Sequence, residues 1–245
     1  MGLNGGFNKL SSQEEVGRNL GGKKFREISN ILKRSSDGIE NTERIIERQL
    51  DILEKHAKKE GLFDIDKVWN EYNSTNGKGI IELEPGTEAD VFLLCNNGKR
   101  SIVKIVKWNT FTFRKRNRTP LEFLINKVMI HNAIFPGLFY QLIGYSHRFD
   151  EFCFVLEQPY IPPLFDDFKK VIGSTEIEIE EDMIKKRGFK KEGKSRIRYV
   201  SEHYLVSDLH LGNVLKGADG GLYYIDPSVR LNEQNRSYND ILINM

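Results

Sequence analysis

The sequence predicts an α+β fold: a five-stranded antiparallel sheet with one helix, preceded by a helical segment and followed by a smaller mixed region. Helical spacing of apolar residues dominates before residue 61, strand-like segments dominate 79–158, and a glycine-rich turn over 217–221 separates two short apolar segments. The 245 residues are enough for two small lobes. A content of 39% hydrophobic and 29% charged residues excludes a disordered chain.

Residues 1–77 are expected to form a helical N-terminal extension. Apolar residues recur with helical spacing at Ile45, Ile46, Leu50 and Leu53. Asn41 or Thr42 would cap this helix and Gly61 would end it. A second short helix is predicted over 64–72.

Residues 78–157 are predicted to hold the sheet, in the order β-β-β-α-β-β. The expected strands are 80–83, 91–95, 101–106, 141–145 and 152–156, and the expected helix is 121–134. Asn97-Gly98 between two strands is a strong hairpin signal. Thr119-Pro120 is typical of a helix start, because threonine caps the helix and proline suits its first position.

Residues 158–245 are predicted to form the smaller region. Helices are expected over 165–171 and over 180–187, the second closed by Gly188. An extended segment over 199–206 precedes a second hairpin, whose strands are 213–215 and 222–225.

The strongest chemical signal joins Asp208, Asn213 and Asp226. Asn213 follows Asp208 by five residues, and Asp226 ends the second arm of the predicted hairpin. Because hairpin arms are antiparallel, Asn213 and Asp226 should meet at one end. Phosphoryl transfer needs one carboxylate to accept a proton, and an amide oxygen with a second carboxylate to hold Mg²⁺. Each residue alone is more often a turn residue, but the set in this order favours function.

A second signal is a lysine within an apolar strand. Lys104 would be costly to bury without a partner, and Glu122 is the only acidic residue of the predicted helix. A buried lysine–glutamate pair that directs an ammonium group at phosphates is the kinase arrangement. Lys107 is the rival for the lysine role. The alternative is a lysine on a solvated strand face.

Several motifs together resemble known kinase-like families. Asp208-Leu209-His210-Leu211-Gly212-Asn213 is similar to the catalytic loop of aminoglycoside phosphotransferases and choline kinases. Over residues 78–232 the chain more closely resembles the kinase domain of polyvalent proteins, in the segments Thr119-Pro120-Leu121-Glu122-Phe123-Leu124, Ile130-His131-Asn132, Phe135-Pro136, Leu156-Glu157-Gln158-Pro159 and Ile225-Asp226-Pro227.

The resemblance implies a protein-kinase-like fold with a five-stranded N-lobe and a minimal C-lobe. It implies an ATP- and Mg²⁺-dependent phosphotransferase that acts on a hydroxyl acceptor, on a protein substrate, and a bacterial mobile-element context. The implied roles are a catalytic base (Asp208), metal ligands (Asn213, Asp226), a phosphate anchor and its partner (Lys104, Glu122), phosphate-loop residues (Gly86, Thr87) and hinge residues for adenine (Glu157, Gln158).

Two departures from the kinase pattern keep alternatives open. Gly86 is the only glycine left in the phosphate loop, since Glu84 and Ala89 stand at the outer positions. Few residues follow Asp226, so no large helical substrate lobe is expected. The alternatives are AMP transfer to protein on the same fold, and a non-catalytic pseudokinase that serves as a binding module.

Charge and cysteine content bear on partners and location. The net charge is +2, but residues 99–118 and 185–198 are strongly basic. Solvated loops are the favoured reading, an acidic protein partner is second, and nucleic acid is disfavoured.

The polar N-terminus and the lack of a long apolar run predict a cytoplasmic protein without membrane attachment. Cys95 and Cys153 read as buried thiols, and the oligomeric state is left open.

Overall fold

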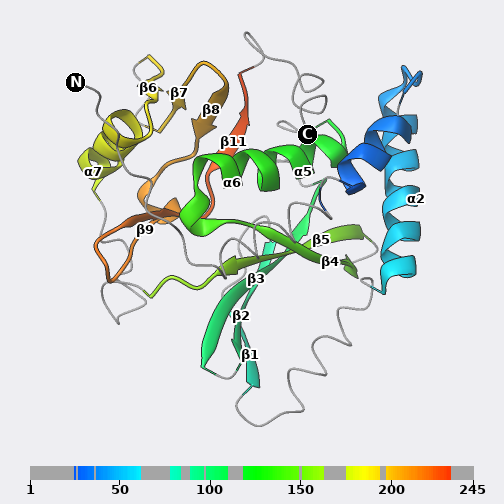
Figure 1. Cartoon of the computed structure of the whole chain (residues 1–245), viewed down its shortest axis with the longest axis horizontal. Coiled ribbons are helices and arrows are strands. Elements are labelled where there is room, and N and C mark those ends of the chain that lie inside the picture. The colour runs from blue at the N-terminus through cyan, green and yellow to red at the C-terminus, as the bar shows by residue number, and fades with distance from the viewer. Residues whose placement is uncertain are drawn as a thin grey trace, which may run out of the picture.

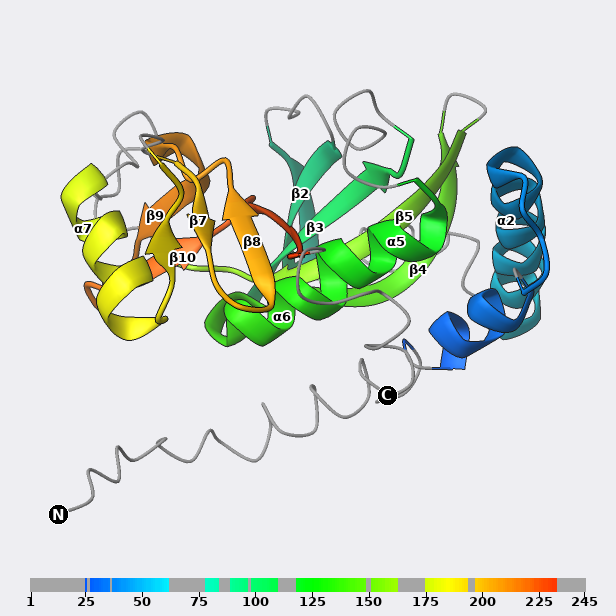
Figure 2. The same cartoon turned by 90° about the horizontal axis from the view of Figure 1, so that it is seen from above.

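The computed structural model describes residues 25–61, 78–83, 89–109, 118–148, 151–162, 175–193 and 197–232, except positions 26, 36 and 97. The part built on the five-stranded sheet is called the upper lobe and the part built on the two smaller sheets the lower lobe, although Figure 1 draws the five-stranded sheet below. Helix α2 lies at the opposite end of the molecule from α7 (Figures 1 and 2). The helices predicted over 64–72 and 165–171 lie outside the described residues.

The five predicted strands of the upper lobe form one antiparallel sheet in the order β1-β2-β3-β5-β4. They are β1 (Lys78–Glu82), β2 (Ala89–Asn96), β3 (Lys99–Lys107), β4 (Gln141–Arg148) and β5 (Glu151–Pro159). The predicted β2–β3 hairpin is confirmed: Asn96 pairs with Lys99, and Gly98 has the left-handed φ of 78° that its tight turn requires.

The two faces of this sheet have different roles. Directly opposed residues of antiparallel strands share a face, so the pairs Lys104–Leu156 and Val106–Phe154 lie on one side. Val106, Phe154 and Leu156 belong to the main core on that side. The register therefore directs Lys104 toward the helix and the lower lobe.

One helix covers that face of the sheet (Figure 2). It runs through α5 (Pro120–Leu124), the π-helical segment η1 (Ile125–Ile130) and α6 (His131–Ile134), with helical backbone at both junctions. Thr119 caps it by accepting a hydrogen bond from the Glu122 amide at 3.3 Å, as the sequence predicts. The π-helical middle was not predicted; such segments are frequent at functional sites.

Helix α2 (Thr42–Glu60) packs on the N-terminal end of that helix (Figure 1). Asn41 caps α2, and Gly61 ends it with a φ of 67°, both as predicted. Gln49 accepts a hydrogen bond from the Leu121 amide at 3.0 Å. Leu53 is fully buried in the same core that holds the helix and the lower lobe. The boundary expected at residue 78 therefore does not separate two cores.

The lower lobe confirms the predicted second hairpin and adds two strands that the sequence did not predict, over 190–191 and 228–231. It contains η2 (Pro136–Leu138), α7 (Glu176–Glu181), the π-helical η4 (Asp182–Lys186), β6 (Lys190–Lys191), β7 (Tyr199–Val200), β8 (Tyr204–Ser207), η5 (Leu211–Asn213), β9 (Val214–Lys216), β10 (Leu222–Tyr224) and β11 (Ser228–Leu231). β9 pairs with β10, and the other sheet has the order β11-β8-β7-β6. β11 also packs against η1.

Helix α7 begins earlier than the sequence predicts, because Thr175 and Glu178 form a capping box. Gly188, with a φ of 72°, follows η4 at the predicted end. None of the described helices is long and apolar enough to cross a bilayer.

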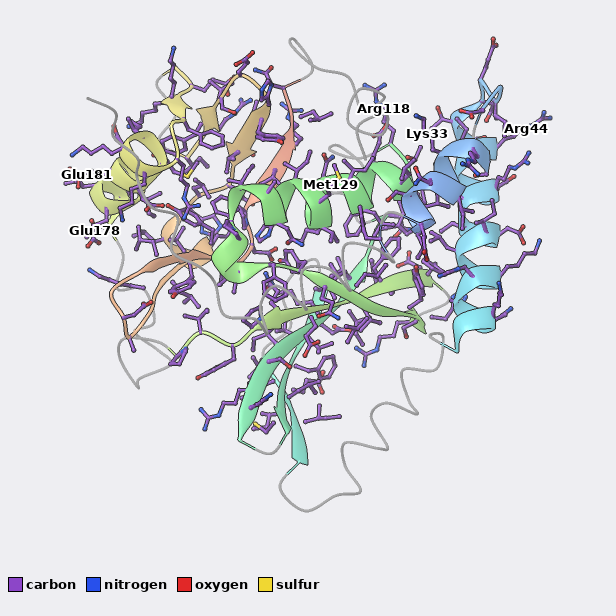
Figure 3. All side chains as sticks on the ribbon, viewed as in Figure 1. Lys33, Arg44, Arg118, Met129, Glu178 and Glu181 are labelled. Carbon is purple, nitrogen blue, oxygen red and sulfur yellow. The ribbon has the colours of Figure 1, made fainter. Side chains whose placement is uncertain are left out.

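The basic segment that begins at residue 185 lies against acidic α7, whose Glu178 and Glu181 are labelled in Figure 3. Lys185 pairs with Glu181 at 2.8 Å, and Lys191 pairs with Glu180. These pairs support the reading of this segment as a solvated, locally neutralised surface.

Candidate active site

A cavity of about 310 Å³ lies between the sheet and the β9–β10 hairpin. Val91 and Ile102 line it from the sheet, and Leu215 and Ile225 line it from the lower lobe. Lys104, Asn213 and Asp226 line its polar part. Two apolar walls beside a charged end suit a ligand with a flat ring and an anionic group.

The strand β5 contributes a buried amide to this cavity. Gln158 is directly opposite Ile102 in the sheet register, so both residues point to the cavity face. Gln158 is only 3% exposed, and its Nε2 has no hydrogen-bond partner among the described residues. Buried amides are almost always hydrogen-bonded, so Gln158, which lines the cavity, is a candidate for a ligand contact.

The residues on either side of Gln158 are less suited to contact a ligand. Pro159 also lines the cavity but has no N–H group to donate. Glu157 pairs with Val103, so its side chain lies on the opposite face of the sheet. Of the two predicted hinge residues, Gln158 thus offers its side chain, and Glu157 can offer only backbone groups.

Lys104 is held in place at the polar end. Its side chain is 8% exposed, and Nζ donates to the Ile225 carbonyl at 2.9 Å and to the Tyr140 hydroxyl at 3.2 Å. Nζ also lies 3.8 Å from Asp226 Oδ1. Asn132 fixes Tyr140 by two hydrogen bonds to its backbone, of 2.8 and 2.6 Å. The ammonium group therefore has a preset position beside Asp226.

Lys127, from η1, reaches the same carboxylate. Its Nζ forms an ion pair with Asp226 Oδ1 and lies 5.2 Å from the centre of the Tyr140 ring. Burial alone would raise the pKa of the Asp226 carboxyl, but the ammonium groups of Lys104 and Lys127 outweigh burial and hold that pKa well below its usual range. Asp226 is therefore ionised at physiological pH.

The loop between β8 and β9 brings Asp208 next to Asn213. The side-chain Nδ2 of Asn213 donates to the backbone carbonyl of Asp208 at 2.9 Å, and the backbone carbonyl of Asn213 accepts from the Ile225 amide at 2.9 Å. The second bond fixes Asn213 near Asp226, as the predicted hairpin requires. Asp208 has a φ of 65°, a left-handed conformation that costs energy and clusters at functional sites. His210 accepts from the Gly212 amide at 3.1 Å, and this bond braces the loop.

A family model described as a serine/threonine/tyrosine kinase found in polyvalent proteins matches residues 46–233. The chain belongs to this kinase family. Membership confirms the predicted kinase-like fold and makes the protein a nucleotide-using phosphotransferase of the protein kinase class. The match begins inside α2, earlier than the resemblance over 78–232. No curated protein matches the chain.

The structure does not bring Glu122 to Lys104, where the sequence suggested a pair. Glu122 Oε2 instead accepts a hydrogen bond from the Arg118 amide at 2.8 Å, just before the helix. A carboxylate three positions into a helix is stabilised there by the free N–H groups of the first turn. Asp226 takes the place of Glu122 as the carboxylate beside Lys104.

The structure also distinguishes Lys104 from its rival, Lys107. Lys107 pairs with Glu151 at 3.2 Å and lies on the other face of the sheet from Lys104. This arrangement favours Lys104 for the cavity. Gly86 and Thr87 lie outside the described residues.

Sequence reasoning missed the contribution of Lys127, and it named His131 only within the motif Ile130-His131-Asn132. Both are buried polar residues, four positions apart in a mostly apolar helix, and that spacing places them near one another on the helix. Burial, reinforced by the charge of Lys127, lowers the pKa of His131 to about 3. The neutral ring donates from Nε2 to the Tyr224 carbonyl at 3.4 Å. The pattern was visible as a lysine and a histidine among apolar residues.

A buried charge cluster anchors the lower lobe of the kinase to the end of the helix. Asp182 accepts hydrogen bonds from Tyr224 at 2.7 Å and from Arg187 at 2.8 Å. Arg187 also donates to the Ile134 carbonyl at 2.6 Å and lies 4.9 Å from the ring centre of Phe135. Burial and the bond to Asp182 raise the pKa of Tyr224. The cluster fixes β10, and with it the position of Asp226.

Proposed function

We propose that this kinase transfers the γ-phosphoryl group of ATP to a hydroxyl group of a protein, with Mg²⁺ as the metal. One observation carries the proposal: a cavity between two lobes that combines apolar walls with Lys104, Asn213 and Asp226. Adenine would lie between the apolar walls, and the triphosphate would extend to the lysine.

The residues at the end of the cavity where adenine would bind would select the nucleotide. The orphan Nε2 of Gln158 can donate to a ring nitrogen of adenine, a task that Pro159 cannot perform. Glu157 would contribute only its backbone. The expected contact is one neutral hydrogen bond in a site with little water.

The residues at the phosphate end would position the reaction. Lys104 would bind phosphate oxygens, and Asp208 would orient the acceptor hydroxyl and accept its proton. The left-handed backbone of Asp208, held by Asn213, supports a fixed position for this base. Asp226 stays ionised, so it cannot serve as a proton donor.

The donor set at this end fits Mg²⁺. Asp226 and Asn213 provide a carboxylate and an amide oxygen, the hard ligands that Mg²⁺ prefers. Within the ranges that the structure covers, no three His, Cys, Asp or Glu side chains gather into a metal site of their own. Phosphate oxygens would complete the ligand shell, and the bound metal would neutralise phosphate charge.

A non-catalytic nucleotide-binding module is the second candidate. The absence of a Lys104–Glu122 pair favours it, because active protein kinases need the lysine–glutamate pair in place. AMP transfer to protein is a further outcome on the same fold. A cytoplasmic location and a bacterial mobile-element context stay predictions from the sequence and the family.

Nucleotide binding is tested first by thermal unfolding with ATP and Mg²⁺. A ligand at 100 times its Kd adds about 2.7 kcal/mol to the free energy of unfolding. We expect the wild type to gain this stability and Asp226→Asn to lose the gain. Asp51→Asn, an exposed aspartate on α2, is the matched control and should behave as the wild type. No gain in the wild type with Mg²⁺ or Mn²⁺ would contradict the proposed function.

A further inference from the structure

The helix over the sheet brings a lysine, rather than a glutamate, to the carboxylate at the polar end of the cavity. The side chains of Lys127 and Lys104 are each 8% exposed, and both approach the same oxygen of Asp226. Lys127 forms the ion pair, and Lys104 lies at 3.8 Å. Two buried ammonium groups therefore share one carboxylate.

A lysine instead of a glutamate changes the net charge around a bound nucleotide. In protein kinases the corresponding constellation is a lysine–glutamate pair and an aspartate, with two Mg²⁺ ions on the phosphates. A lysine in place of the glutamate adds two positive charges, which equals the charge of one divalent cation. Phosphoryl transfer requires positive charge around the phosphate oxygens, and lysine can supply part of it.

Asp226 and Asn213, the residue types that hold both metal ions in protein kinases, are already engaged with other groups at this end. Asp226 Oδ1 already faces two ammonium groups. Asn213 uses its Nδ2 to hold the Asp208 carbonyl, so only its amide oxygen remains for a metal. The three His, Cys, Asp or Glu side chains of a dedicated metal site are not found together in the described part of the chain.

We propose that Lys127 takes the place of one of the two metal ions, so that two lysines and a single divalent cation hold the phosphates. This inference rests on the proposed function, since it assigns the charges of the same site. In the nucleotide complex the cation takes Asp226, and Lys127 binds a phosphate oxygen instead. The absence of a Lys104–Glu122 pair is then compatible with an active kinase.

The number of bound metal ions gives the first test. The wild type is saturated with the β,γ-imido analogue of ATP and titrated with Mn²⁺, and free Mn²⁺ is followed by electron paramagnetic resonance. One Mn²⁺ per protein is expected. Two Mn²⁺ per protein would overturn the inference and leave the proposed function standing. If the analogue does not bind with any metal, the proposed function fails and the inference fails with it.

Nucleotide affinity without metal gives the second test. In EDTA the wild type should still bind the analogue, and Lys127→Met should weaken binding at least about tenfold, as expected for loss of a charge-assisted contact. Lys107→Met is the matched control, because Lys107 lies on the same strand as Lys104 but faces away from the cavity. Equal affinity of all three proteins would overturn the inference.

Restoring the usual charge gives the third test. Lys127→Glu should make nucleotide binding strictly metal-dependent and raise the count to two Mn²⁺ per protein. A count that stays at one would overturn the claim that Lys127 replaces an ion. Thermal unfolding without nucleotide shows whether the variants fold. If they do not, the metal count of the wild type decides the matter.

Discussion

The β9–β10 hairpin and the helix α5–η1–α6 both contribute to one cavity, but they follow the kinase arrangement to different degrees. The hairpin and the loop before it supply Asp208, Asn213 and Asp226 in the usual order, with Asn213 bonded to both neighbouring segments. The helix brings Lys127 to Asp226, and its Glu122 contacts the Arg118 amide instead of Lys104. The hairpin therefore keeps the kinase arrangement of residues, and the helix departs from it.

The largest effect should come from the hairpin side of this comparison. Asp208→Asn should lower the rate of phosphoryl transfer by about 10²–10⁴-fold, because it removes the general base. Asparagine tolerates a left-handed backbone, so the variant should keep its fold and its nucleotide affinity. Steady-state kinetics and nucleotide titration measure the two effects. An unchanged rate would remove Asp208 from the mechanism.

The second-largest effect should come from His131 on the helix. It should appear as a dependence of the unfolding free energy on pH. The pKa of His131 falls to about 3 on folding, from an ordinary value near 6.5. The unfolded chain therefore binds a proton below about pH 6.5 that the folded chain does not, and stability falls as the pH is lowered.

Between pH 7 and pH 5 the His131 contribution should cost about 2 kcal/mol of unfolding free energy. Urea unfolding at the two pH values measures it, and His131→Gln should reduce the loss. His56→Gln, on α2, is the control and should keep the wild-type dependence. A loss of the same size in the His131 variant would contradict the buried neutral histidine.

The smallest effect should come from the end of the cavity where adenine would bind. Gln158→Leu removes one neutral hydrogen bond and should weaken ATP binding by about three- to tenfold. Gln141→Leu, on the neighbouring strand β4, is the control and should leave the affinity unchanged. Calorimetric titration with ATP gives both values. An affinity unaltered by Gln158→Leu would mean that backbone groups alone bind the adenine.

The two regions also differ in how well the sequence predicts them. The Asp208–Asn213–Asp226 set depends on short spacings and one hairpin, and chain connectivity brings such residues together. The β2–β3 hairpin with Gly98 is equally local. These features could therefore be predicted from the residues alone.

The contacts of the helix depend on its rotation about its own axis and on its π-helical middle, which local patterns do not determine. Glu122 was expected beside Lys104 because opposite charges attract, but its own helix N-terminus is a nearer partner. Strand β11 was missed for a similar reason, since its pairing with β8 joins distant segments.

The most direct test of the account is the fate of the label from ATP. Wild type, Asp208→Asn and Asp226→Asn are incubated with a general protein acceptor and ATP labelled on the γ- or the α-phosphate. Label from the γ-phosphate alone should reach the acceptor, in the wild type only. Transfer of the α-label would show AMP transfer instead. Nucleotide binding without transfer of either label to the general acceptor or to the kinase itself would contradict a phosphotransferase.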